Sequence, residues 1–168
     1  MKMILKKKFW FTMTLSLGML VAAQAQQAST LSIEGEVASP LKLTVAELLS
    51  MDRMTHTVKD RDNQEHTFSG IPLIKLLEKA GAATGPALRG KNMSLFILAQ
   101  AADGYEVVYA LPEVDPGFSD RLVLVAIEKD GQALLKGEGA FRLIATGDKK
   151  QARWVRELQT IKVLFAKP

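Results

Sequence analysis

The feature that most constrains the fold is a predicted β-hairpin in the middle of the chain. Residues 93–101 form a nearly continuous apolar run, Asp103-Gly104 follows, and residues 105–110 return as a second strand. Asp-Gly is favoured in tight hairpin turns, where both central residues take positive φ. Strands joined so closely pair antiparallel, which indicates a sheet built from hairpins rather than from strand-helix-strand units.

The same alternation of short strands and turns continues along the rest of the chain. Further strands are predicted at residues 31–37, 41–43, 53–59, 65–68, 122–127, 141–145 and 161–165. Two short helices are expected, one after the capping box of residues 44–47 and one from Pro72 to Gly81, with leucines at helical spacing. The sequence therefore predicts one α+β domain of mixed, mostly antiparallel short-strand sheets with two short helices.

Two histidines in the hairpin of residues 53–68 raise the question of a metal site. Imidazole groups near methionines suit copper, and His56 and His66 lie close to Met51 and Met54 in the sequence. If the turn closes around residues 62–63, strand alternation places the two imidazoles on opposite faces. No metal site is therefore predicted.

The first 25 residues have the pattern of a signal peptide. Four lysines accompany an apolar run at residues 9–22, and Ala23-Gln-Ala25 is an A-x-A cleavage motif. The apolar run is too short for a membrane-spanning helix. We expect residues 26–168 to be the folded domain, exported by a general secretory-type signal to the periplasm, with no membrane span after cleavage.

Charge and cysteine content exclude several classes of function. The four lysines of the predicted signal peptide account for the whole excess of 22 basic over 18 acidic residues. The remaining domain is formally neutral, which argues against a role in binding nucleic acid. The chain has no cysteine, so disulfides, thiolate metal ligands and cysteine nucleophiles are excluded. No catalytic residue is assigned, because nucleotide-loop, serine-elbow and metalloprotease motifs are lacking.

The strongest candidate for a binding site is the stretch from Gly139 to Arg156. Its cations surround an apolar strand, a Gly-Asp turn and a tryptophan: Arg142, Lys149, Lys150, Arg153 and Arg156. Guanidinium groups bind phosphate and carboxylate through paired hydrogen bonds. The stretch therefore predicts an anion-binding site, and the alternative is that its arginines form salt bridges with the acids of the domain.

Four segments of the chain, taken in order, resemble one known family. They are Phe68-Ser-Gly-Ile-Pro-Leu-Ile-Lys-Leu-Leu77, Asp103-Gly-Tyr105, Gly139-Ala-Phe-Arg-Leu143 and Arg153-Trp-Val-Arg156. Together they are similar to the oxidoreductase molybdopterin-binding domain, the catalytic-domain fold of the sulfite oxidase family. The resemblance covers nearly all of residues 26–168. It implies a molybdopterin cofactor held by Arg142 and Arg156, with Arg153 as a further cofactor-binding candidate.

The chain also departs from the pattern that the resemblance implies. The family's molybdenum is held by a cysteine thiolate near residues 58–60, and a histidine precedes the arginine at position 142, yet the chain has no cysteine and residues 136–139 are Lys-Gly-Glu-Gly. A carboxylate or amine does not replace a soft thiolate ligand. Members loaded with cofactor before export use a twin-arginine signal, and residues 1–25 contain no arginine.

Three functions are compatible with these predictions. The first is a periplasmic module of this fold that binds an anionic small molecule or a protein partner without molybdenum chemistry. The second is a molybdopterin-dependent oxidoreductase whose metal site uses no thiolate. The third is an interaction module of a membrane-associated redox system.

Overall fold

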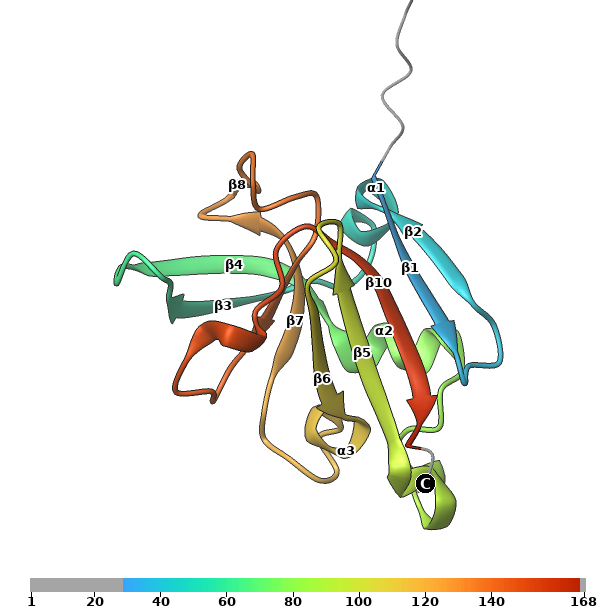
Figure 1. Ribbon diagram of the computed structural model, residues 1–168. Helices are drawn as coiled ribbons and strands as arrows, with labels where there is room; N and C mark the ends of the chain where they lie inside the picture. The colour runs from blue at the N-terminus through green and yellow to red at the C-terminus, as the bar shows by residue number, and fades with distance from the viewer. Residues whose placement is uncertain (1–28, 167–168) are drawn as a thin grey trace, which may run out of the picture.

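The computed structural model describes residues 29–166, which form two five-stranded sheets (Figure 1). The first sheet has the strand order β2-β1-β10-β5-β6. Its strands are β1 (Thr30–Gly35), β2 (Leu41–Thr44), β5 (Leu95–Ala101), β6 (Glu106–Ala110) and β10 (Leu158–Phe165). β1 and β10 pair parallel, and the other pairs are antiparallel. The signal peptide predicted for residues 1–25 lies outside the described residues.

The second sheet is organised around β7. Its strands are β3 (Met54–Lys59), β4 (Glu65–Pro72), β7 (Val123–Lys129), β8 (Gln132–Ala133) and β9 (Arg142–Ala145). β7 pairs antiparallel with β4, β8 and β9, and β3 pairs with β4 at the edge. In Figure 1 the β3–β4 hairpin projects from the body of the protein, beside the loop that leads from β9 to β10.

Both predicted helices are present, and a third was missed. α1 (Val45–Leu49) begins with the expected capping box, and α2 (Leu73–Ala80) ends at Gly81, whose φ of 73° requires the left-handed conformation that glycine favours. α3 (Leu111–Val114) has only four residues, too few for a helical repeat to be visible in the sequence. Short 3₁₀ turns η1 (Gly85–Ala87), η2 (Gly90–Ser94) and η3 (Gln151–Arg153) lie in loops. The α+β class is confirmed.

The core is a single cluster to which both sheets and α2 contribute. Leu73, Leu76 and Leu77 of α2 are fully buried, and α2 contacts β1 of one sheet and β4 and β7 of the other. Burying a leucine side chain contributes about 1.5–3 kcal/mol to the free energy of folding. From residue 29 to residue 166, none of the helices has the length and apolar character needed to cross a membrane.

The register of the β3–β4 hairpin differs from the prediction by one residue. Val58 lies opposite His66, and His56 lies opposite Phe68, so both histidines are on the same face and the prediction of opposite faces was wrong. The reason is Asn63, whose φ of 65° closes a three-residue turn between Asp60 and Gln64. A turn of odd length shifts every later residue of β4 to the other face.

Candidate functional site

A pocket of about 620 Å³ lies between the β3–β4 hairpin and the β9–β10 loop. One wall is formed by Val58, Lys59, Asp60, Arg61 and Asn63, and the other by residues 145–152 and Trp154. The Gln151 side chain donates a hydrogen bond to the backbone oxygen of Lys59 and thereby joins the two walls. Figure 1 shows the two segments side by side. We call this cavity the hairpin pocket.

The walls of the hairpin pocket carry more cations than acids. Four exposed basic side chains line it, and none of them forms an ion pair with any residue that the structure describes: Lys59, Arg61, Lys149 and Lys150. The two lining acids, Asp60 and Asp148, are both paired with other cations. The pocket therefore presents uncompensated positive charge to solvent.

Asp60 is the buried acid of this pocket. Its side chain is 4 % exposed and accepts two hydrogen bonds from Arg142, at 2.7 and 2.9 Å, and one from Lys129 at 3.0 Å. Burial alone would raise the pKa of Asp60, but the hydrogen bonds from Arg142 and Lys129 outweigh it and hold the pKa well below its ordinary value. The carboxylate is therefore ionised, and both of its oxygens already accept hydrogen bonds from Arg142 or Lys129.

Arg142 lies beneath the pocket rather than in its lining. The side chain is completely buried, its guanidinium also binds Glu138, and it packs 5.0 Å from the Phe68 ring centroid and 5.6 Å from that of Trp154. Its Nε is buried without a hydrogen-bond partner among the described residues. The predicted role of Arg142 in holding a cofactor stays a prediction, but its described contacts position Asp60.

Arg153 is held by a second cluster of charges. Its Nε and Nη2 donate to the two carboxylate oxygens of Asp148 at 2.9 and 2.8 Å, its Nη1 contacts Glu113 at 3.1 Å, and Arg121 also binds Asp148. The guanidinium stacks 4.6 Å from the centroid of the Tyr109 ring. Hydrogen bonds from Arg153, opposed by burial, lower the pKa of Asp148. This arrangement matches the salt-bridge alternative considered for the arginines.

Arg156 is exposed and lines a smaller cavity of about 280 Å³ next to the hairpin pocket. Arg61, Tyr105 and Trp154 line the same cavity, together with Ala101 and Asp103. Arg61 and Trp154 line both cavities. We call the smaller one the arginine pocket.

Backbone contacts hold the segment that carries Trp154 and Arg156. Val155 exchanges two hydrogen bonds with Leu143 of β9, at 2.7 and 3.1 Å. Because side chains alternate along an extended chain, Trp154 and Arg156 point to one side and Val155 is buried on the other. Gly139 has a φ of 80°, and a Cβ atom there would lie 2.5 Å from the Cα of Glu157, so only glycine allows this close approach.

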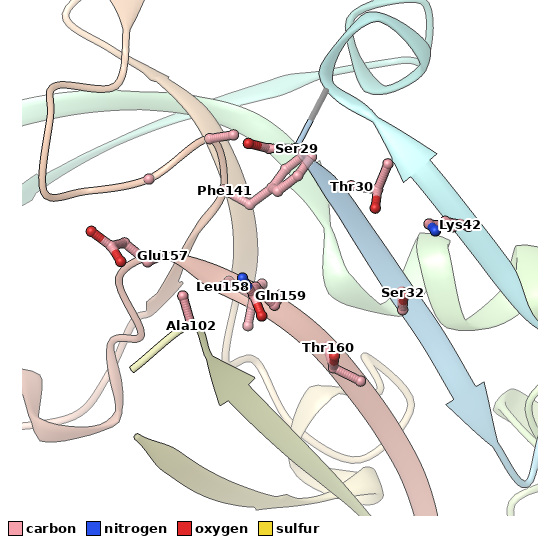
Figure 2. A pocket seen from close by; sticks show the side chains of 12 residues that line it. Ser29, Thr30, Ser32, Lys42, Ala102, Phe141, Glu157, Leu158, Gln159 and Thr160 are labelled. Atoms are coloured by element: carbon pink, nitrogen blue, oxygen red, sulfur yellow. The ribbon is translucent and has the colours of Figure 1, made fainter. Parts of the chain in front are cut away.

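A third cavity, of about 600 Å³, has a different character (Figure 2). Hydroxyl and amide side chains at the start of β1 and β10 dominate its lining, including Thr30, Gln159 and Thr160. Lys42 and Glu157 contribute one charge of each sign. Because the two charges balance, this cavity has no electrostatic preference for an anionic ligand.

The binding stretch predicted from the sequence contains one wall of the hairpin pocket and none of the residues of the other wall. Lys149 and Lys150 were in the predicted binding stretch, whereas Lys59 and Arg61 were treated only as hairpin residues. The available signal was the resemblance itself, which implies that the family's metal ligand lies near residues 58–60. Those residues form a wall of the hairpin pocket.

Comparisons with known proteins agree with the fold. The family model described as oxidoreductase molybdopterin binding domain matches residues 19–167. The crystal structure of the sulfane dehydrogenase SoxCD from Paracoccus pantotrophus is similar, with a TM-score of 0.63 and 22 % sequence identity over 81 % of this chain and 38 % of that chain. The chain thus spans well under half of that protein, and the likeness concerns the fold. No curated protein matches the chain. By the extent of the family match, the chain belongs to the oxidoreductase molybdopterin-binding domain family.

Proposed function

We propose that this protein is an exported member of the family that binds an anionic small molecule in the hairpin pocket and does not carry out thiolate-bound molybdenum chemistry. One observation carries the proposal. Within residues 29–166, four exposed cations line the pocket without carboxylate partners, while both lining carboxylates are neutralised by arginines. An anion entering the pocket would therefore meet attractive charge without displacing an existing ion pair.

The residues at the site do not fit the family's molybdenum centre. The chain has no cysteine, and the acid near the expected thiolate position, Asp60, is occupied by Arg142 and Lys129. Within residues 29–166 there is no group of three histidine, aspartate or glutamate side chains placed to hold a metal ion. We therefore assign no reaction step to this metal. The proposal extends to the location, since the pattern of residues 1–25 is that of a general secretory signal to the periplasm.

Membership of the family favours a second candidate, a molybdopterin-dependent oxidoreductase. The two candidates differ in what the purified protein would contain. Expression of the full chain in cells that make the cofactor, followed by metal and pterin analysis, separates them. Stoichiometric molybdenum and pterin would overturn the binding-module proposal, and substoichiometric traces of both would support it.

The anion site itself is tested with inorganic phosphate as the probe. A ligand that binds the native state and not the unfolded state raises the melting temperature, and the rise grows with the logarithm of the ligand concentration above Kd. We expect phosphate to stabilise the full chain and the double variant Lys149→Gln/Lys150→Gln to lose most of that stabilisation. Lys79→Gln/Lys136→Gln removes two exposed charges that do not line the pocket and serves as the matched control. Equal phosphate responses in the two double variants would contradict the proposal.

A periplasmic protein with an acidic surface would compete for the same four cations. Such a partner predicts co-purification with the wild-type chain and its loss in the Lys149→Gln/Lys150→Gln variant. Without a response to phosphate, that result would favour the interaction module over the small-molecule site.

A further inference from the structure

We propose that the hairpin pocket and the arginine pocket are two halves of one binding site, and that its ligand carries two separated anionic groups. The chemical class is a small molecule with two anionic groups, such as a dicarboxylate or a phosphorylated carboxylic acid. The inference rests on the proposed function, because the first anionic group occupies the hairpin pocket. It adds a second subsite at Arg156 and a bridging role for Arg61.

Shared lining residues connect the two pockets. Arg61 and Trp154 line both of them, so the cavities meet along these two side chains. Tyr105 of the arginine pocket donates from its hydroxyl to the backbone oxygen of Ala152, at 2.6 Å, and Ala152 belongs to the wall of the hairpin pocket. The hydrogen bond ties the two walls to each other.

The boundary between the pockets is rigid. Trp154 is 4 % exposed, its Nε1 donates to the Ala145 oxygen at 2.7 Å, and its ring meets Phe68 edge to face with centroids 6.3 Å apart. The backbone on the C-terminal side of Trp154 is fixed by the exchange of hydrogen bonds between Val155 and Leu143. These contacts preform the boundary between the two subsites, and a preformed site lowers the cost of binding a ligand of matching length.

Charge supports an anionic group at the second subsite. Arg61 and Arg156 form no ion pair with any residue between 29 and 166. Asp103, the acid of this pocket, accepts the backbone N–H of Tyr105 at 2.9 Å within its own turn. Two guanidinium groups against one carboxylate leave the subsite positive. A ligand with a single anionic group would place that group in the hairpin pocket and leave Arg156 without a partner.

The test compares a ligand that has one anionic group, a phosphate, with a ligand that carries a phosphate and a separate carboxylate. Isothermal titration of the full chain with inorganic phosphate and with 3-phosphoglycerate gives two affinities and their ratio. We expect 3-phosphoglycerate to bind at least about tenfold more tightly than phosphate, the gain of roughly one charge-assisted hydrogen-bonded contact. Arg156→Gln should bring that ratio to about one and leave the phosphate affinity within about twofold of the wild-type value.

Two further variants make the outcome decisive. Lys149→Gln/Lys150→Gln should weaken both ligands by similar factors, and Arg89→Gln, an exposed arginine outside both pockets, should change neither. If phosphate binds through the lysines but Arg156→Gln leaves the ratio unchanged, the second subsite is wrong and the proposed function stands. If neither ligand binds the wild-type chain, both proposals are wrong. Melting temperatures of all variants verify that each is folded.

Discussion

The cations between Gly139 and Arg156 fall into two groups that differ in what they contact. Arg142 and Arg153 each form a two-pronged contact with an aspartate, the first fully buried and the second partly exposed. The cations of the other group are exposed and unpaired within residues 29–166: Lys149, Lys150 and Arg156. The comparison shows that the same type of charge, within one short stretch, either fixes the acids of the site or faces the solvent.

Local structure explains why each residue belongs to its group. Arg142 begins β9, whose four residues are all buried, so its long side chain reaches a carboxylate inside the protein. A guanidinium suits this position because its planar fork binds both carboxylate oxygens. Lys149 and Lys150 follow the turn at Gly147 and extend into water. A lysine ammonium is strongly hydrated and remains exposed at little cost.

The largest expected loss of stability comes from replacing Arg142, the fully buried arginine of the first group. Arg142→Ala leaves Asp60 and Glu138 buried without their shared partner. Breaking a buried ion pair from one side costs about 3–5 kcal/mol of the free energy of unfolding. Chemical denaturation of the variant at neutral pH measures this loss. Arg142→Lys should recover only part of it, because an ammonium cannot reproduce the two-pronged contact. A loss below about 1 kcal/mol would mean that the cluster is dispensable for stability.

A smaller effect is expected in the cluster around Arg153. Asp148→Asn removes the charge that Arg121 and Arg153 share, and both arginines are partly exposed and able to regain water. We expect a loss of about 1.5–3 kcal/mol at neutral pH, the range for hydrogen bonds to charged groups. Asp120→Asn, an exposed acid of the same region without an ion pair in residues 29–166, is the matched control.

The pH dependence of the Asp148 effect has a defined sign. Hydrogen bonds from Arg153 lower the pKa of Asp148 in the folded protein. Its contribution is therefore present above the ordinary aspartate pKa and is lost as pH falls through the lowered value. The difference in unfolding free energy between wild type and Asp148→Asn should narrow on acidification below about pH 4. A difference that widened with acid would contradict the ion-pair explanation.

Features set by neighbouring residues were predictable from the sequence. The capping box at residues 44–47, the position of the turn at Asp103-Gly104 and the glycine that ends α2 each depend on contacts within a few positions. That turn differs from the expected two-residue type, because it spans residues 102–104 and Gly104, but not Asp103, takes a positive φ. The predicted register of the β3–β4 hairpin was wrong because of one residue. Asn63 takes a left-handed conformation that its sequence context permits but does not require.

The partners of the arginines were not predictable in the same way. Asp60 and Arg142 are 82 positions apart and meet because Asp60 follows β3, β3 pairs with β4, and β4 and β9 both pair with β7. The same long-range pairing places Lys59 and Arg61 in one wall of the hairpin pocket, opposite the loop that carries Lys149. Residue type suggested an anion site in this stretch, and the topology decides which cations line a cavity.

His66 provides a weaker, pH-dependent contact near the turn of the β3–β4 hairpin. Its Nδ1 lies 2.6 Å from Asp130 and its Nε2 lies 2.8 Å from Asp62, which links the β3–β4 turn to the β7–β8 turn. Hydrogen bonds to Asp130 and then Asp62 raise the pKa of His66. The stabilising contribution is therefore complete below the ordinary histidine pKa of about 6.5 and is lost as pH rises through the raised value.

We expect the melting temperature of His66→Gln to fall below that of wild type at pH 6 and to approach it in alkaline buffer. His56→Gln changes the other histidine of the same face, which has no acidic partner within the described residues, and is the control. A deficit that persisted undiminished at high pH would assign His66 a packing role instead.

The smallest expected effect on stability belongs to the exposed lysines. Lys149 and Lys150 form no ion pair within the described chain, and surface substitutions without a partner usually change the free energy of unfolding by less than about 0.5 kcal/mol. Lys149→Gln/Lys150→Gln should therefore unfold at the wild-type denaturant midpoint in low-phosphate buffer. Neutralising two adjacent like charges removes repulsion, so any shift should be a slight gain that added sodium chloride reduces. A loss as large as that of Asp148→Asn would place these lysines among the cations that hold the structure together, and the distinction between the two groups would fail.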